Sequence, residues 1–88
     1  MTRRYLLSGR VQGVGFRFFT QRAATQLGVV GWVRNCPDGA VEAVAQGSEE
    51  ALQAFRQHLQ QGPSWSEVRR IEETRAEPGT FTAFNIEM

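Results

Sequence analysis

The pattern of apolar and polar positions predicts where the chain forms strands and helices. Alternation over residues 3–11 predicts a first strand with one face on a core. Apolar residues then recur at four-residue spacing from Phe19 to Leu27, which predicts a helix that begins just past Arg17. Gly28 is the expected residue beyond its C-terminus. The chain therefore starts with a strand, a loop and a helix.

The next segment has the pattern of a β-hairpin. Residues 29–36 and 41–46 alternate as strands do, and Pro37-Asp38-Gly39 has the composition of a turn. Proline presets φ at such a position, and glycine supplies a positive φ. We therefore predict a hairpin over residues 30–46.

A second helix and two more strands complete the pattern. Ser48 can cap the N-terminus of the helix, and Gly62-Pro63 ends it. Residues 65–75 form a charged strand whose irregular apolar spacing suggests a bulge or an edge position. Thr82, Phe84 and Ile86 alternate in a short final strand. The order β-α-β-β-α-β plus a C-terminal strand predicts an α+β, ferredoxin-like fold: an antiparallel sheet with two helices on one face.

Composition limits the kind of protein. With 88 residues, of which 41% are hydrophobic, we expect residues 1–88 to form a single domain. Cys36 is the only cysteine, so no internal disulfide can form, which fits a cytoplasmic setting. No apolar run is long enough for a signal peptide or a transmembrane helix, so we expect no membrane partner. A net charge of +1 gives no basic footprint for nucleic acid.

The loop between the first strand and the first helix has the residues of an anion site. Gly13 and Gly15 let backbone N–H groups turn inward, and the start of a helix adds further N–H donors. Arg17 adds a planar cation with five donors. These features favour an anion shaped like phosphate, although the same glycines also suit a plain tight connection.

The residue inventory excludes several chemistries. The chain has no lysine and no GxxxxGK[ST] motif, so the loop is not a Walker loop. Asp38 and His58 are the only aspartate and histidine; the first lies in a turn, and we expect the second on the solvated side of a helix. A catalytic triad or a histidine-rich metal site is therefore not expected. We assign Phe16, Phe18 and Phe19 to core packing.

Asn35 ends the second predicted strand. In a ferredoxin-like sheet, the second strand flanks the third, which neighbours the first, and this order can bring Asn35 near the loop after the first strand. Its amide would then lie beside Arg17. An amide at a strand end is also a common turn former, and the spacing permits both interpretations.

Two stretches of the chain resemble the acylphosphatase family. Residues 7–17, LSGRVQGVGFR, are similar to the first motif of that family across the whole loop. Residues 31–41, GWVRNCPDGAV, running on to Gly47, are similar to the second. The similarity covers nearly the whole chain and shows no departure at a functional position.

The resemblance implies hydrolysis of the carboxyl-phosphate bond of acylphosphates to a carboxylate and inorganic phosphate. It implies that Arg17 and the loop amides hold the phosphoryl group and that Asn35 orients the attacking water. The implied phosphate-binding residues are Gln12, Gly13, Val14, Gly15, Phe16 and Arg17. An acylphosphate has a good leaving group, so the chemistry needs no cofactor, metal or covalent nucleophile, which agrees with the residue inventory.

The expected partners are a small acylphosphate and inorganic phosphate, the latter as product and inhibitor, with the protein acting as a monomer. An RNA-recognition module has the same order of elements, but its central strands carry stacking aromatics and residues 39–46 have none. An acylphosphatase-like domain that handles carbamoyl phosphate or binds phosphate as a regulator is the other alternative; the shortness of the chain argues against a module of a larger enzyme.

Overall fold

A computed structural model describes residues 1–87 of the chain. The strands and helices occur in the predicted order, and the hairpin and second helix occupy the predicted positions. Their bounds are β1 (Thr2–Arg10), α1 (Phe16–Leu27), β2 (Val30–Asn35), β3 (Val41–Gln46), α2 (Glu49–Gln61), β4 (Glu67–Arg75) and β5 (Phe84–Ile86).

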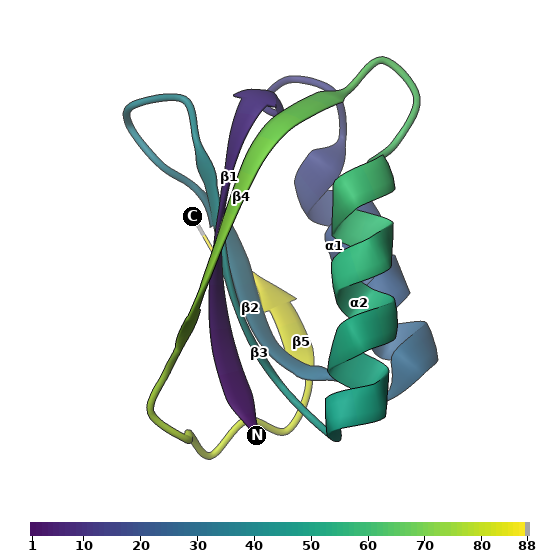
Figure 1. Cartoon of the computed structure of the whole chain (residues 1–88), viewed down its shortest axis with the longest axis vertical. Coiled ribbons are helices and arrows are strands. Elements are labelled where there is room, and N and C mark those ends of the chain that lie inside the picture. The colour runs from purple at the N-terminus through teal and green to yellow at the C-terminus, as the bar shows by residue number, and fades with distance from the viewer. Residues whose placement is uncertain (88) are drawn as a thin grey trace.

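The five strands form one sheet, and both helices cover the same face of it (Figure 1). The strand order is β4-β1-β3-β2-β5. The first four strands pair antiparallel, whereas β5 adds to β2 in parallel, so the sheet is mixed at one edge. The α+β, ferredoxin-like architecture is thereby confirmed, with the short C-terminal strand extending the sheet beside β2.

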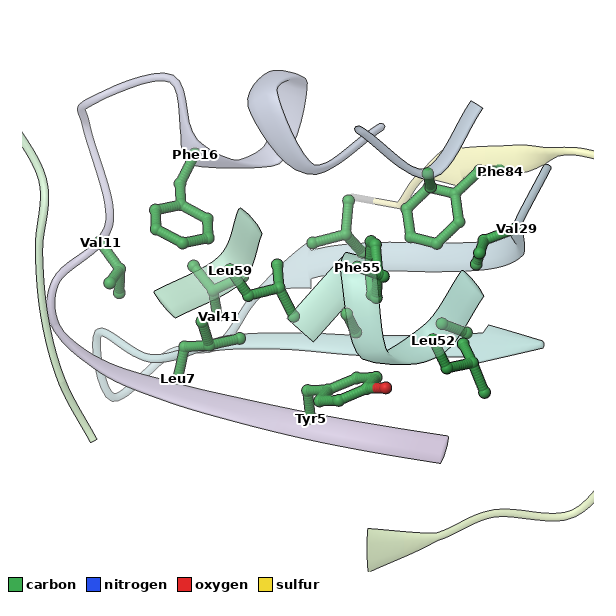
Figure 2. Close-up of a cluster of buried hydrophobic side chains, with 14 residues drawn as sticks. Tyr5, Leu7, Val11, Phe16, Val29, Val41, Leu52, Phe55, Leu59 and Phe84 are labelled. Atoms are coloured by element: carbon green, nitrogen blue, oxygen red, sulfur yellow. The ribbon is translucent and has the colours of Figure 1, made fainter. Parts of the chain in front are cut away.

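The core lies between the sheet and the two helices. Tyr5 and Leu7 of β1 face Phe55 and Leu59 of α2, and Phe16 reaches into the same cluster from the start of α1 (Figure 2). The rings of Tyr5 and Phe55 meet edge to face with centroids 5.5 Å apart. Burial raises the pKa of Tyr5 to about 12, and its hydroxyl has no hydrogen-bond partner within residues 1–87.

Helix α1 begins at Phe16 rather than past Arg17, so both residues lie in its first turn. The irregular spacing in β4 is a register shift against β1 between Ser8 and Gly9, and β4 is an edge strand, so both suggestions are confirmed.

The assignment of Phe18 to the core is wrong, because its side chain is 58% exposed. Phe16 is buried at the helix start, and two residues along an α-helix rotate the side chain to roughly the opposite side.

His58 does not lie on the solvated side of its helix as the sequence suggested. It is half-buried, and its ring meets that of Phe19 edge to face with the ring centroids 6.3 Å apart.

Within residues 1–87, no helix has the length and apolar character needed to cross a membrane.

Candidate active site

A cavity of about 220 Å³ lies where the loop after β1, the start of α1 and the end of β2 meet. Two elements far apart in the sequence come together here because β1 and β2 both pair with β3. In Figure 1 the β1–α1 loop and the β2–β3 turn lie at the same end of the sheet. The residues that line the cavity are Val11, Gly13, Gly15, Phe16, Arg17, Phe18, Asn35 and Ile86.

The loop after β1 has a backbone that two glycines make possible. Gly13 has φ 75° and Gly15 has φ 77°, both in the left-handed region. A Cβ atom at either position would meet nothing within 4 Å, so backbone conformation rather than space calls for glycine. Alternate right- and left-handed residues of this kind can form a concave anion-binding nest of N–H groups.

The backbone N–H groups in the first turn of α1 lack the acceptors that usually bind them at a helix start. No side chain among residues 1–87 caps this turn, and it contains no acidic residue. The first intrahelical bond runs from Phe19 N to Gly15 O at 3.0 Å, so the amides before Phe19 have no carbonyl acceptor within the helix. Unsatisfied N–H donors and the positive end of the helix dipole favour an anion at this point.

Arg17 is the cation of the cavity. It lies in the first turn of α1 and is half-buried. None of the ion pairs formed within residues 1–87 includes Arg17. No carboxylate of residues 1–87 therefore neutralises its guanidinium, and the planar fork of this group suits two oxygens of one anion.

The side chain of Gln12 ties the loop to the β2–β3 turn. Its Nε2 donates to Cys36 O at 2.8 Å and to Ala40 O at 2.9 Å. Cys36 N also donates to Ala40 O at 2.8 Å, which closes the turn. Both hydrogens of the Gln12 side-chain amide are therefore used in bonds within the protein. Only the backbone N–H of Gln12 remains to face an anion.

Asn35 is the last residue of β2 and lies opposite Val41 in the register of β3. Its half-buried side chain lines the same cavity as Arg17. The proximity predicted from strand order is thus what the fold produces. The strand that carries Asn35 is held against β3 by the pair Arg34–Glu42, with Arg34 Nε to Glu42 Oε1 at 2.7 Å.

Glu42 joins two strands on the open face of the sheet. It accepts hydrogen bonds from Arg34 on one side and from Arg4 on the other. Burial acts to raise the pKa of this carboxyl, but the two guanidinium groups outweigh burial and hold the pKa below its usual value. Glu42 is therefore ionised, and its charge is neutralised by Arg4 and Arg34.

Cys36 follows Asn35 directly but does not have the environment of a reactive thiol. Burial and the negative charge of Glu42 raise its pKa, so the thiol stays protonated at neutral pH. Among residues 1–87 no three His, Cys, Asp or Glu side chains are grouped as metal ligands would be. What the cavity offers is a guanidinium, backbone amides and one side-chain amide.

Comparison with known proteins shows the family to which the chain belongs. The family model for acylphosphatase matches residues 3–86. The chain belongs to the acylphosphatase family. It is 51% identical over 87 residues to an acylphosphatase of Koribacter versatilis, an alignment that covers 98% of this chain and 79% of that one.

Solved structures agree with the family assignment. The crystal structure of acylphosphatase from Bacillus subtilis has a TM-score of 0.96 at 40% identity, and the match covers 99% of this chain and 98% of that one. Full-length HypF in a phosphate- and nucleotide-bound form matches with a TM-score of 0.89 at 27% identity, but the match covers only 12% of that much longer chain.

The cavity brings together most of the residues that the sequence singled out. Gly13, Gly15, Phe16, Arg17 and Asn35 line it. The other two predicted residues do not: Val14 lines a neighbouring hollow, and Gln12 turns its side chain to the hairpin.

Sequence reasoning missed three residues of the cavity wall, Val11, Phe18 and Ile86. Ile86 lines the cavity because β5 pairs in parallel with β2, which places Ile86 opposite Val33. No local pattern in the sequence indicates that pairing. Exposure of Phe18 follows from helical rotation, and placing the helix start at Phe16 would have revealed it.

Proposed function

We propose that this chain hydrolyses acylphosphates in the cavity at the end of β1 and β2, with the phosphoryl group on the β1–α1 loop and the attacking water on Asn35. One observation carries the proposal. In a member of the acylphosphatase family, one small cavity is lined by an arginine without an ion-pair partner within residues 1–87, by a helix start that no described side chain caps and by a strand-end asparagine. Each group has a distinct part in the reaction.

The phosphoryl group occupies the loop. Arg17 grips two of its oxygens, and backbone amides between Gln12 and Phe16 donate to the remaining negative charge. This arrangement suits a reaction in which catalysis is mainly positioning and stabilisation of charge on the phosphoryl oxygens. The positive φ angles of Gly13 and Gly15 support this assignment, because they allow successive N–H groups to converge.

Asn35 orients the nucleophile. A water molecule held by its side-chain amide attacks phosphorus, and a bond forms between the water oxygen and phosphorus. The bond between phosphorus and the acyl oxygen breaks, and the carboxylate leaves with the electron pair. The proton of the water passes to an oxygen of the phosphate, since no histidine or aspartate lines the cavity. The products are a carboxylate and inorganic phosphate.

We propose that the reaction proceeds without metal or cofactor. The groups around the cavity are donors suited to an anion, and the single aspartate, Asp38, accepts a hydrogen bond from Ala40 N in the hairpin turn. The carboxylate of the substrate is itself a good leaving group, so the protein need not supply a Lewis acid for it.

The test is hydrolysis of benzoyl phosphate in excess EDTA. We expect cleavage at an undiminished rate, competitive inhibition by inorganic phosphate, and far slower release of phosphate from a phosphomonoester such as phenyl phosphate. Loss of activity on chelation that a divalent ion restores would contradict the metal-free mechanism. Equal rates on the ester and the anhydride would contradict the substrate class.

We further propose that residues 1–88 work as one cytoplasmic, monomeric domain on a small substrate. Cys36 as the only cysteine supports a reducing compartment. A nucleic-acid-binding module of this fold needs exposed aromatic side chains on its central strands for bases to stack on. Here the aromatic of β1, Tyr5, is buried beneath the helices, and β3 has none, which argues against that alternative.

A further inference from the structure

A second and larger hollow lies between the two helices next to the proposed phosphate site. Its volume is about 490 Å³, more than twice that of the cavity around Arg17. We call it the helix groove. Its wall is mainly apolar, and the side chains that matter for its chemistry are Phe18, Phe19, Arg22, Ala23, His58 and Pro63.

The helix groove adjoins the phosphate site. Gly15 and Phe18 line both hollows, and the loop residue Val14 lines the groove. Phe18 is 58% exposed at this junction although it belongs to a helix with a buried face. A substrate with its phosphoryl group on the loop can therefore extend its remaining part past the ring of Phe18 into the groove.

The polar groups of the helix groove are cationic or neutral. Arg22 lies over the ring of Phe18 at 5.8 Å from the centroid, and no ion pair within residues 1–87 includes it. His58 sits with its ring against Phe19. No acidic side chain among the described residues lines the groove. The groove thus pairs an aromatic surface with the positive charge of Arg22, which no carboxylate of residues 1–87 neutralises.

We propose that the helix groove binds the acyl group of the substrate and favours aromatic acyl groups with a carboxylate remote from the phosphoryl end. This inference rests on the proposed function and adds a substrate class to it. The ring of such a substrate stacks on Phe18, which removes apolar surface from water. The remote carboxylate meets the guanidinium of Arg22, whose planar donors suit it.

Three substrates separate the parts of this proposal. Acetyl phosphate has an acyl group too short to enter the groove, benzoyl phosphate adds the ring, and 4-carboxybenzoyl phosphate adds the remote charge. We expect kcat/KM to rise in that order. The rise from the second to the third substrate should weaken with added salt, because the contact with Arg22 is exposed.

Two variants assign the effects to residues. Phe18→Ala should lower the benzoyl-to-acetyl ratio of kcat/KM about tenfold, as expected for loss of one aromatic contact. Arg22→Gln should leave that ratio near its original value but lower the 4-carboxybenzoyl-to-benzoyl ratio by about two- to fivefold. Trp65→Ala and Arg70→Gln are the matched controls. They remove an exposed aromatic and an exposed arginine that line neither hollow, and both ratios should stay unchanged.

Binding of the corresponding acylphosphonates, measured by calorimetry, tests the groove without turnover. The affinity should follow the same order, and Phe18→Ala should weaken the benzoyl compound selectively. Equal kcat/KM for the three substrates, or ratios that survive both variants, would overturn the groove as an acyl site. Absence of any hydrolysis together with ordered phosphonate affinities would instead contradict the proposed reaction and leave the groove assignment standing.

Discussion

The two helices of this protein begin in opposite ways. Helix α2 is capped by Ser48, whose Oγ accepts from Ala51 N at 3.1 Å, and Glu49 and Glu50 lie in its first turn. Helix α1 starts from Gly15 in a left-handed conformation, without a side-chain cap and without an acidic residue in its first turn. One start is satisfied by its own sequence, whereas the other leaves its donors open.

The difference separates a helix start that its own side chains satisfy from one that we propose to serve the ligand. A capping hydroxyl or a first-turn carboxylate binds the same amides and offsets the same partial charge that an anionic ligand would use. Where these are present, as at α2, the helix gains stability by itself. Where they are absent and an unpaired Arg17 is present instead, the start of α1 is left for the ligand. The predictions that follow test this contrast.

The largest effect is expected at Arg17. Arg17→Ala should lower kcat/KM for benzoyl phosphate by about 10³-fold or more, as loss of an arginine that stabilises a transferring phosphoryl group does. Arg17→Lys should be nearly as damaging, because an ammonium is a point charge that cannot grip two oxygens in one plane. Steady-state kinetics measure both. Near-normal turnover by the lysine variant would show that charge alone suffices.

Asn35 should show a separate kind of loss. If it orients water, Asn35→Ala lowers kcat by about 10²- to 10³-fold, the usual loss for one positioned donor. The inhibition constant of inorganic phosphate should stay nearly constant, and so should the melting temperature, because a strand-end amide has few core contacts. Loss of phosphate affinity along with the rate would make Asn35 a ligand of the anion. An unchanged kcat with a lowered melting temperature would make it a turn former only.

Gln12 should act on the rate by positioning the turn beside Asn35. Gln12→Met keeps the volume but removes the donors to Cys36 O and Ala40 O, so kcat should fall about tenfold through misplacement, with phosphate inhibition retained. Gln46→Met is the matched control. Gln46 Nε2 donates to Gly79 O, and Gln46 Oε1 accepts from Gly79 N and Thr2 Oγ1, all away from the cavity. Loss of these bonds should lower the melting temperature while kcat is kept. Equal kcat losses in the two variants would contradict a positioning role.

The smallest effect is expected at the capped helix α2, where we expect stability to fall and activity to stay the same. Ser48→Ala should lower the free energy of unfolding by about 1 kcal/mol, the usual loss for a hydroxyl cap. For a domain of this size, that corresponds to a fall in melting temperature of about 4–8 °C. Thermal unfolding and benzoyl phosphate kinetics together provide the measurement. If kcat/KM fell along with the free energy of unfolding, the start of α2 would also serve activity, which would contradict the contrast between the two helix starts.

Local chemistry in the sequence determined the elements and the open helix start. Alternation predicted β1 to β3, Ser48 and Gly62 bounded α2, and the spacing of the loop glycines with Arg17 indicated an anion site before any fold was considered. These features depend on backbone conformation and side-chain periodicity, which neighbouring residues control.

Tertiary structure alone decided which residues share a wall with that loop. Pairing of both β1 and β2 with β3 brings Asn35 to the loop, and parallel addition of β5 adds Ile86. The half-burial of His58 depends on how α1 packs against α2. Contacts between elements distant in the chain follow from strand order and helix packing, and neither has a period or motif that one stretch of sequence carries.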